Sequence, residues 1–303
     1  MTRLAIFIIW LFHWLPLSVL SRLGQALGVL SYFLVLPRKR IAAINLALCF
    51  PELDKSTRKR LLLRHFQALG RSMLERGLLW WASPERLRRI IRFEGEEHLR
   101  ALVQAGTPVI LLAPHFIGLD MGGARVAMSF DSVSMYAQQK GNPVLSNWLY
   151  YGRKRFGDQV LLSRKDGIRS VVKSIKSGRP FYYLPDMDYG RKDAIFVPFF
   201  GVKAATITGL SRLAHLTGAR VLPCVTRMLP GGAGYVLGIG EAWENFPTAD
   251  VEADTRRMND WIESVARTMP EQYYWVHRRF KTRPVGQALL YTKKTFHHHE
   301  RMI

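Results

Sequence analysis

The first forty residues carry two apolar stretches that set them apart from the rest of the chain. Residues 4–21 contain no formally charged side chain and are rich in Ile, Leu, Phe and Trp. After Arg22, a second apolar stretch covers residues 23–36 and ends at the basic Pro37-Arg38-Lys39-Arg40. Eighteen uncharged residues are close to the minimum that spans a bilayer, although Pro16 interrupts the helical pattern. The pattern predicts a membrane-spanning helix or a helix in the membrane interface, with a buried core helix as the third alternative.

The flanks of this apolar segment indicate its topology. A signal peptide is disfavoured, because the apolar run is too long and no clear small-x-small cleavage site follows it. Basic residues cluster on the C-terminal side of the run, and the positive-inside tendency then places the main domain in the cytoplasm. Residues 1–36 are therefore expected to form a membrane anchor or an interfacial helix.

The body of the chain changes from helical to alternating patterns. Residues 56–71 place leucines at helical spacing, and Ser83-Pro84-Glu85 is typical of a helix N-terminus. From Thr107 onward, short apolar runs alternate with helical patterns, and residues 108–113 predict a buried strand. Further strands are expected at 160–162, 181–184 and 221–225, and helices at 167–177 and 206–217. The chain is therefore predicted to have an α/β fold, with a largely parallel sheet flanked by helices and an N-terminal membrane helix. We expect the anchor at 1–36, a main domain at 37–286 and a C-terminal tail at 287–303.

The charge balance predicts an anionic partner. The 303 residues include 44 Lys and Arg against 23 Asp and Glu, a formal net charge of +21, while 48% of residues are hydrophobic. The apolar fraction excludes disordered and collagen-like chains. The excess of positive charge indicates nucleic acid, an anionic membrane, or an acidic substrate or carrier. A basic helix face that is either solvated or in contact with anionic lipid is formed by Arg86, Arg88, Arg89 and Arg92.

The sequence contains no motif for several classes of chemistry. Cys49 and Cys224 belong to no pair or metal-spaced cluster, so neither a disulfide scaffold nor a zinc module is indicated. The sequence contains no P-loop and no dinucleotide fingerprint after a strand. His297-His298-His299 is interpreted as a solvated tail in preference to a metal site. No metal and no cofactor are expected.

The candidate chemistry follows the first strong strand, in Ala113-Pro-His115-Phe-Ile-Gly-Leu-Asp120. On one continuous helix, His115 and Asp120 would be rotated by about 500°, leaving their side chains roughly 140° apart. They can pair if His115 lies on the strand-to-helix turn and Asp120 on the first helical turn. An imidazole supported by a carboxylate is a competent general base, and the alternative is a structural histidine at a strand end.

This turn and the segments after it resemble the glycerolipid and lysophospholipid acyltransferase superfamily. More narrowly, they resemble the late acyltransferases of lipid A biosynthesis, the lauroyl and myristoyl transferases of Gram-negative inner membranes, from the N-terminal anchor to about Gly286. Besides His115 and Asp120, the resemblance is carried by Asn142-Pro143, Gly152-Arg153-Lys154-Arg155-Phe156-Gly157, Leu162-Ser163-Arg164, Leu184-Pro185-Asp186-Met187-Asp188-Tyr189-Gly190, Val197-Pro198-Phe199-Phe200-Gly201-Val202, Ala204-Ala205-Thr206 and the segment from Pro270 to Lys281.

The resemblance implies roles for individual residues. His115 would deprotonate an acceptor hydroxyl with support from Asp120, where many relatives have Glu. The substrate-binding positions that it implies are Asn142, Arg153, Arg164, Asp186 and Asp188. Of the two aspartates, either one could be the functional carboxylate, and Asp188 could equally order the turn at Gly190. The segment Gln138-Gln139-Lys140-Gly141 departs from the expected Arg-Pro-type pattern, so one family contact is either missing or replaced by Lys140.

The implied reaction is transfer of a fatty acyl chain from acyl carrier protein to a hydroxyl of a lipid A precursor of the Kdo-lipid IVA type. It would take place at the cytoplasmic face of the inner membrane, so the expected partners are the carrier protein, the glycolipid and anionic lipid. An activated thioester needs a base but no covalent nucleophile, and neither cysteine lies near His115 in the sequence. The alternatives are a lysophospholipid or other glycolipid acceptor, and a membrane-tethered nucleic-acid-binding protein.

Two aromatic segments complete the expectations. Residues 196–202 followed by Lys203 would suit a wall of an acyl channel, with hydrophobic packing as the alternative. Residues 273–283 interleave aromatic and basic side chains, as membrane-interface, phosphate-binding and nucleic-acid-binding surfaces do.

Overall fold

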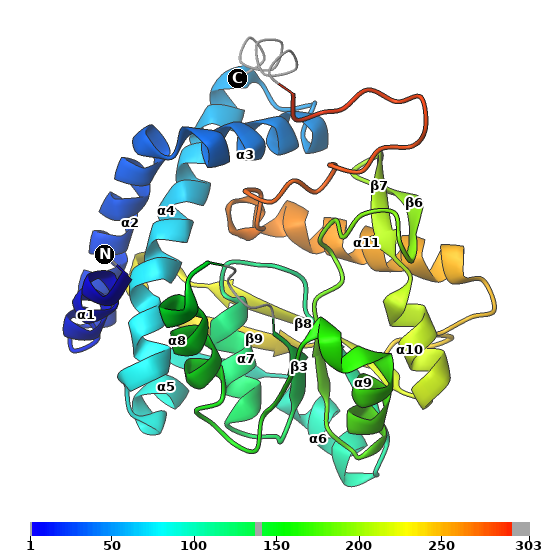
Figure 1. Cartoon of the computed structure of the whole chain (residues 1–303). Coiled ribbons are helices and arrows are strands. Elements are labelled where there is room, and N and C mark those ends of the chain that lie inside the picture. Colours follow the sequence, from blue (N-terminus) through cyan, green and yellow to red (C-terminus); the bar gives the residue numbers. More distant parts are fainter. Residues whose placement is uncertain (1, 137–140, 293–303) are drawn as a thin grey trace. The chain divides into compact units, whose positions relative to one another are not determined.

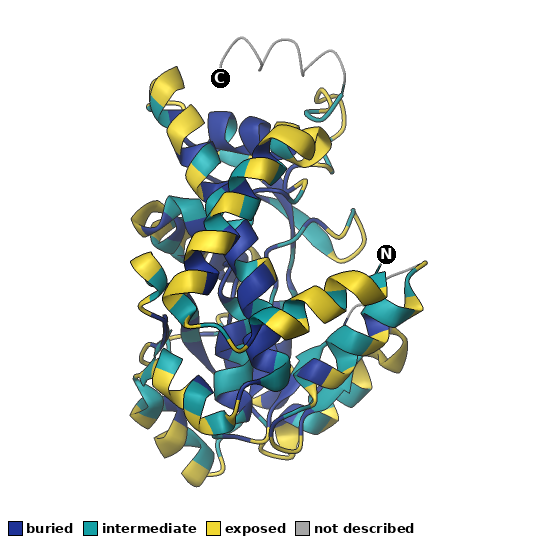
Figure 2. Ribbon diagram, turned by 90° about the vertical axis from the view of Figure 1, so that its left-hand side faces the viewer, coloured by how far each residue is buried: buried dark blue, intermediate teal, exposed yellow. Residues whose placement is uncertain are grey.

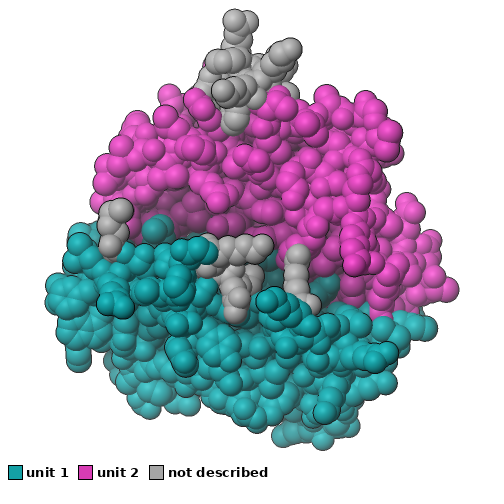
Figure 3. Space-filling model, in the orientation of Figure 1, with its two compact units in different colours: residues 1–23, 72–184, 213–246 teal, residues 24–71, 185–212, 247–303 magenta. Residues whose placement is uncertain are grey.

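The structure is a computed structural model that describes residues 2–136 and 141–292. The chain forms two compact units, which Figure 3 shows in different colours. Unit 1 comprises residues 1–23, 72–184 and 213–246, and unit 2 comprises residues 24–71, 185–212 and 247–303. The predicted segments Gln138-Gln139-Lys140 and His297-His298-His299 lie outside the described residues.

The elements follow one another along the chain as Figure 1 labels them. The helices are α1 (Thr2–Phe12), α2 (Leu17–Leu34), α3 (Leu36–Cys49), α4 (Lys55–Trp81), α5 (Pro84–Ile90), α6 (Glu96–Gln104), α7 (Leu119–Ala127), α8 (Pro143–Arg153), α9 (Gly167–Lys176), α10 (Gly209–Thr217) and α11 (Val251–Thr268). The strands are β1 (Ile91–Glu94), β2 (Val109–Leu112), β3 (Val133–Met135), β4 (Val160–Leu162), β5 (Phe181–Tyr183), β6 (Ala194–Phe199), β7 (Val202–Ile207), β8 (Arg220–Met228) and β9 (Tyr235–Ile239). Short 3-10 helices are η1 (Arg164–Asp166), η2 (Pro230–Gly232) and η3 (Pro270–Gln272).

Unit 1 is built on a seven-stranded sheet in the order β1-β9-β8-β2-β5-β3-β4. Every neighbouring pair is parallel except β8 and β9, which pair antiparallel. Strand β2 lies between β8 and β5, with Ile110 opposite Val221 on one side and Phe181 on the other. All four residues of β2 are buried, as expected for a parallel strand covered on both faces. The predicted α/β fold with a largely parallel sheet is confirmed.

Helix α7 packs unusually closely on this sheet. A Cβ atom added to Gly122 would lie 1.9 Å from the hydroxyl oxygen of Thr226 on β8. Only glycine permits this approach, because real Cβ atoms do not come so near another heavy atom. Helix α7 is thereby held close against β8.

Unit 2 contains a hairpin that the sequence patterns did not predict. Strands β6 and β7 pair antiparallel from Ala194 opposite Ile207 to Phe199 opposite Val202. Phe200 and Gly201 make the two-residue turn with φ angles of 51° and 73°, which is the type of turn that fits twisted strands. Phe199 is fully buried, and its ring lies 6.3 Å from that of Phe280. The aromatic run at 196–202 therefore packs, at least through Phe199, into the core of unit 2.

The N-terminal apolar segment is divided into two helices. Helix α1 ends at Phe12 and α2 begins at Leu17, directly after Pro16. The uncharged run of residues 4–21 is therefore not one continuous helix, because proline has no backbone N–H to donate and fixes its own φ angle. Among the described helices, Leu17–Leu34 is long and apolar enough to cross a membrane.

Candidate active site

His115 lies at the carboxyl end of the central strand of unit 1. Strand β2 ends at Leu112, and the Ala113 N–H still donates to the Tyr183 carbonyl at 2.8 Å. A tight turn follows, in which the Phe116 N–H donates to the Pro114 carbonyl at 2.7 Å. His115 in this turn is half-buried. The carboxyl edge of a parallel sheet is where α/β proteins place their reactive groups.

Asp120 is the second residue of α7, so the turn and the first helical residues separate it from His115, as predicted. Its carboxylate accepts from two guanidinium groups: Arg76 Nη2 donates to Oδ2 at 2.9 Å, and Arg153 Nη2 donates to Oδ1 at 2.8 Å. Burial by itself would raise the pKa of this carboxyl. The neighbouring Arg153 and Arg76 outweigh burial and lower the pKa of Asp120 to about 2. Asp120 is therefore a fixed negative charge at any physiological pH.

The two arginines reach Asp120 because α4 and α8 pack closely against each other. The indole rings of Trp80 on α4 and Trp148 on α8 stack with centroids 4.6 Å apart, and Trp80 Nε1 donates to the Trp148 carbonyl at 2.6 Å. A Cβ atom on Gly152 would lie 1.8 Å from the Trp80 ring, so glycine is required there. Arg76 lies one turn before Trp80, and Arg153 directly follows Gly152. The packing of these two helices consequently sets both guanidinium positions.

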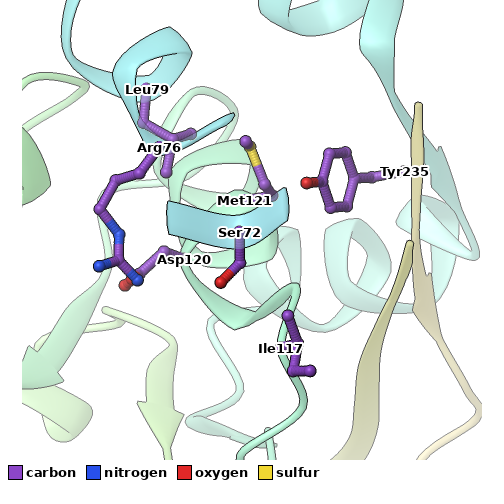
Figure 4. Close-up of a pocket in the computed structure, with 7 residues that line it drawn as sticks. All are labelled: Ser72, Arg76, Leu79, Ile117, Asp120, Met121 and Tyr235. Atoms are coloured by element: carbon purple, nitrogen blue, oxygen red, sulfur yellow. The ribbon is translucent and has the colours of Figure 1, made fainter. Parts of the chain in front are cut away.

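A small pocket opens beside this carboxylate (Figure 4). Its polar lining comes from Ser72 and Arg76 of α4, Asp120 of α7 and Tyr235 of β9, and its apolar lining comes from Leu79, Ile117 and Met121. The Tyr235 hydroxyl donates to the carboxylate of Glu75, which is fully buried. The pocket thus lies between Ile117, at the end of the His115 turn, and Tyr235, whose hydroxyl contacts Glu75.

The structure places the other residues predicted for the site in several different settings. Asn142 caps α8 by accepting from the Leu145 N–H at 3.0 Å, and its amide donates to the Thr2 hydroxyl at 3.0 Å. Arg153, predicted as a substrate contact, lies on Asp120. Arg164 begins η1, two positions after the last residue of β4 and thus near the carboxyl edge of the sheet.

Asp186 and Asp188 are buried in unit 2, at 2% and 4% exposure. Asp188 accepts from the Thr282 N–H at 2.6 Å, from the Thr282 hydroxyl at 2.8 Å and from the Gly190 N–H at 2.9 Å. The Asp188 N–H donates to His277 Nε2 at 3.0 Å. Burial, followed by the charge of Asp186, raises the pKa of Tyr273. Asp188 orders the Gly190 turn, which was one of the two interpretations left open, and also holds the segment around Thr282.

Sequence reasoning missed Arg76 as a residue of the site. It lies 44 positions before Asp120 in a helix with many basic residues, and nothing in that pattern singles it out. Arg153 was found through its motif, but its partner could not be derived, because ion pairing across elements depends on how α4, α7 and α8 pack. Within residues 2–136 and 141–292, no three His, Cys, Asp or Glu side chains group as metal ligands would.

Comparison with known proteins identifies the family of this chain. Residues 1–282 match the family described as bacterial lipid A biosynthesis acyltransferase. The chain is 36% identical to the lipid A biosynthesis lauroyltransferase of Escherichia coli (strain K12), over 94% of this chain and 93% of that one. It is 33% identical to the palmitoleoyltransferase of the same pathway and strain, over 94% and 92%, and 30% identical to the myristoyltransferase, over 91% and 84%.

A solved structure, the 1-acyl-sn-glycerophosphate acyltransferase PlsC from Thermotoga maritima, matches with a TM-score of 0.39 and 14% identity, over 89% of this chain and 98% of that one. The sequence matches extend over nearly the full length of both partners, and they include the His115 turn and the helices that carry Arg76 and Arg153. The chain therefore belongs to the bacterial lipid A biosynthesis acyltransferases and is an acyltransferase enzyme.

Proposed function

We propose that this enzyme transfers a fatty acyl chain from acyl carrier protein to a hydroxyl of a lipid A precursor of the Kdo-lipid IVA type. His115 is the general base in this proposal, and Asp120 is its supporting carboxylate. The observation that carries the proposal is a half-buried histidine that follows the central strand, five positions before a carboxylate that two arginines hold in place at the start of α7.

The reaction needs one proton acceptor and no covalent enzyme intermediate. The His115 imidazole removes the proton of the acceptor hydroxyl as the hydroxyl oxygen attacks the thioester carbonyl carbon. The tetrahedral intermediate collapses, the C–S bond breaks, and the leaving thiolate takes the proton from the imidazolium. Both cysteines are buried, and burial raises the pKa of Cys49 and of Cys224, which disfavours a thiolate nucleophile at either position.

Asp120 stabilises the imidazolium by its charge and does not take the proton. Because Arg153 and Arg76 lower the pKa of Asp120 to about 2, its carboxylate is a poor proton acceptor at neutral pH. Arg76 and Arg153 are positioning residues in this scheme: they hold the carboxylate in one orientation.

The location that we propose is the cytoplasmic face of the inner membrane. The exposed apolar side chains of α1 and α2 support attachment to lipid, and the net charge of +21 suits an anionic leaflet, a phosphorylated glycolipid and an acidic carrier protein. Substrate-binding roles for Arg164, for Asn142 and for one of Asp186 and Asp188 belong to this proposal as well.

The experiment is an in vitro transfer assay with purified protein, a tetra-acylated lipid A precursor and acyl carrier protein loaded with chains of different lengths. Mass spectrometry should detect one added acyl group, and His115→Ala should lower the rate at least 100-fold. His215→Ala, which changes an exposed histidine on α10, is the matched control and should retain the wild-type rate. Acylation of lysophospholipid but not of the lipid A precursor, or a His115→Ala rate close to wild type, would contradict the proposal.

A further inference from the structure

Helix α9 in unit 1 has a strongly basic outer face. Val171 and Ile175 are buried and turn toward the sheet, and α9 contains no aspartate or glutamate. The outer face is formed by exposed residues at helical spacing, together with the exposed lysine two positions before the helix. These residues, which we call the α9 face, are Lys165, Ile168, Arg169, Lys173 and Lys176.

The positive charges of the α9 face are not neutralised by the protein itself. Among the described residues, no acidic side chain forms an ion pair with any of its four cations. The nearest acid in sequence, Asp166, instead accepts from the Ser163 N–H at 2.6 Å and from the Ser163 hydroxyl at 2.7 Å. By contrast, Arg179, three positions after the helix, pairs with Asp158 at 2.5 Å. Like charges at helical spacing repel one another, so an anionic partner would stabilise this face.

An apolar side chain lies beside these charges. Ile168 is 56% exposed, although it is directly followed by Arg169 on the same helix. Interfaces between proteins combine apolar contact with a charged rim, and complementary charge guides the encounter of the two partners. The α9 face therefore has the chemistry of a docking surface for an acidic protein.

The α9 face begins at the same edge of the sheet as the His115 turn. Strands β2, β5, β3 and β4 are neighbours in this order, and each adjacent pair is parallel. Their carboxyl ends therefore meet at one edge, where His115 follows β2 and Lys165 follows β4. Three spacings of about 4.8 Å separate these two strands, so the start of the α9 face lies about 14 Å along the edge from the His115 turn.

Helix α9 lies on the opposite face of the sheet from α8 and α1. The chain runs from β3 through α8 out to β4, and then returns through α9 to β5, on the other side of β3. Crossovers between parallel strands are right-handed, so two crossovers that run in opposite directions place their helices on opposite faces. Figure 1 shows α8 and α9 on either side of β3, and α1 contacts α8. No residue of α1 is buried (Figure 2), so the apolar helix of unit 1 that suits lipid lies on the α8 side, away from the α9 face.

From its charge, its position and its orientation, we infer that the α9 face is the docking surface for the small acidic protein that delivers the acyl donor. The carrier protein holds its thioester on a flexible phosphopantetheine arm. A carrier bound at the α9 face can therefore extend this arm along the sheet edge and present the thioester carbonyl to the acceptor hydroxyl at His115. This inference rests on the acyl donor of the proposed function, and it adds the place on unit 1 where that donor binds.

A binding experiment with fluorescently labelled acyl carrier protein tests the surface directly. Arg169→Glu with Lys173→Glu reverses two exposed charges without removing a buried side chain, and should weaken binding of the carrier at least tenfold. Binding to the wild-type protein should weaken steeply with added salt, because exposed charges are screened. Lys55→Glu with Lys59→Glu on α4 gives the same net charge and is the matched control, which should bind as the wild type does. Equal losses in the two variants, or no loss in the α9 variant, would overturn the inference.

Transfer kinetics separate docking from catalysis. The α9 variant should raise KM for the loaded carrier at least tenfold, and should leave kcat and KM for the glycolipid acceptor unchanged. Its binding to vesicles that contain anionic lipid should also stay unchanged, and a loss of vesicle binding with an unchanged KM for the carrier would show that the α9 face meets lipid instead. If the wild type and the α9 variant use the loaded carrier equally well, the docking surface alone is overturned. If the wild type does not use the loaded carrier at all, the proposed function fails, and this inference fails with it.

Discussion

Arg153 offers the sharpest test of how this site works, because the sequence and the structure assign it differently. The sequence predicts a substrate contact, whereas the structure places its guanidinium 2.8 Å from the Asp120 carboxylate. We expect Arg153→Met to lower kcat roughly tenfold, which corresponds to about 1.4 kcal/mol, and to leave KM for both substrates unchanged. The physical reason is that the carboxylate loses one of its two anchors while the substrate loses nothing.

The magnitude for stability follows from the pKa of Asp120. A pKa of about 2, against an ordinary value near 4, corresponds to roughly 2 to 3 kcal/mol of stabilisation at neutral pH. Arg76 and Arg153 contact the carboxylate at nearly equal distances, and both side chains are about one-third exposed to solvent. Solvent screening reduces the share of each, so Arg153→Met should lower the free energy of unfolding by about 1 kcal/mol. The folded-state pKa stays below neutrality without Arg153, so this loss should not vary between pH 6 and 8.

The assay combines steady-state transfer kinetics with urea unfolding followed by tryptophan fluorescence. Lys154→Met, which removes the neighbouring exposed cation, is the matched control and should leave kcat and stability unchanged. In an Asp120→Asn background, Arg153→Met should cost little further activity, because the group that it positions is already altered. A raised KM with an unchanged kcat, or a full additional loss in the Asp120→Asn background, would refute the positioning role.

Three further predictions concern stability. Gly70→Ala should destabilise the protein by more than about 2 kcal/mol in urea unfolding, because the added Cβ atom would lie 2.2 Å from the backbone of α2. Gly123→Ala is the control and should be neutral or stabilising, because its Cβ atom would make ordinary contacts at 3.7 Å. Equal effects of the two substitutions would contradict the close helix contact. Burial lowers the pKa of His65 to about 4, so below about pH 6.5 the unfolded chain binds more protons than the folded protein. The free energy of unfolding should therefore fall by about 2 to 3 kcal/mol between pH 7 and 4.5, and His65→Gln should remove this part of the pH dependence. Asp188→Asn leaves a donor facing the Thr282 N–H and should lower the thermal midpoint and expose the C-terminal segment to proteases, and an unchanged proteolysis pattern would contradict its anchoring role.

Local patterns were sufficient for several strands of the sheet and for the turn that carries His115. The buried run at Val109–Leu112 forms β2, and the helix pattern at 167–177 forms α9 at Gly167–Lys176, because apolar periodicity reports directly which face is buried. Ser83 accepts from the Arg86 N–H as an N-cap, which depends on neighbouring residues alone. The placement of His115 and Asp120 on either side of a strand-to-helix turn could likewise be predicted, since only five positions separate them.

Tertiary structure decided what each polar group touches. The sequence left open whether the apolar run at 196–202 lines a channel or packs in a core. In the structure it forms part of the β6–β7 hairpin and packs through Phe199, because burial depends on residues distant in sequence such as Phe280. Arg76 became part of the site only when α4 and α8 packed through Trp80, Trp148 and Gly152. Hydrophobic patterning is local and can be read from neighbouring residues. Ion pairs and close helix contacts join residues that are far apart in sequence, and their distance in space is set only when the chain folds.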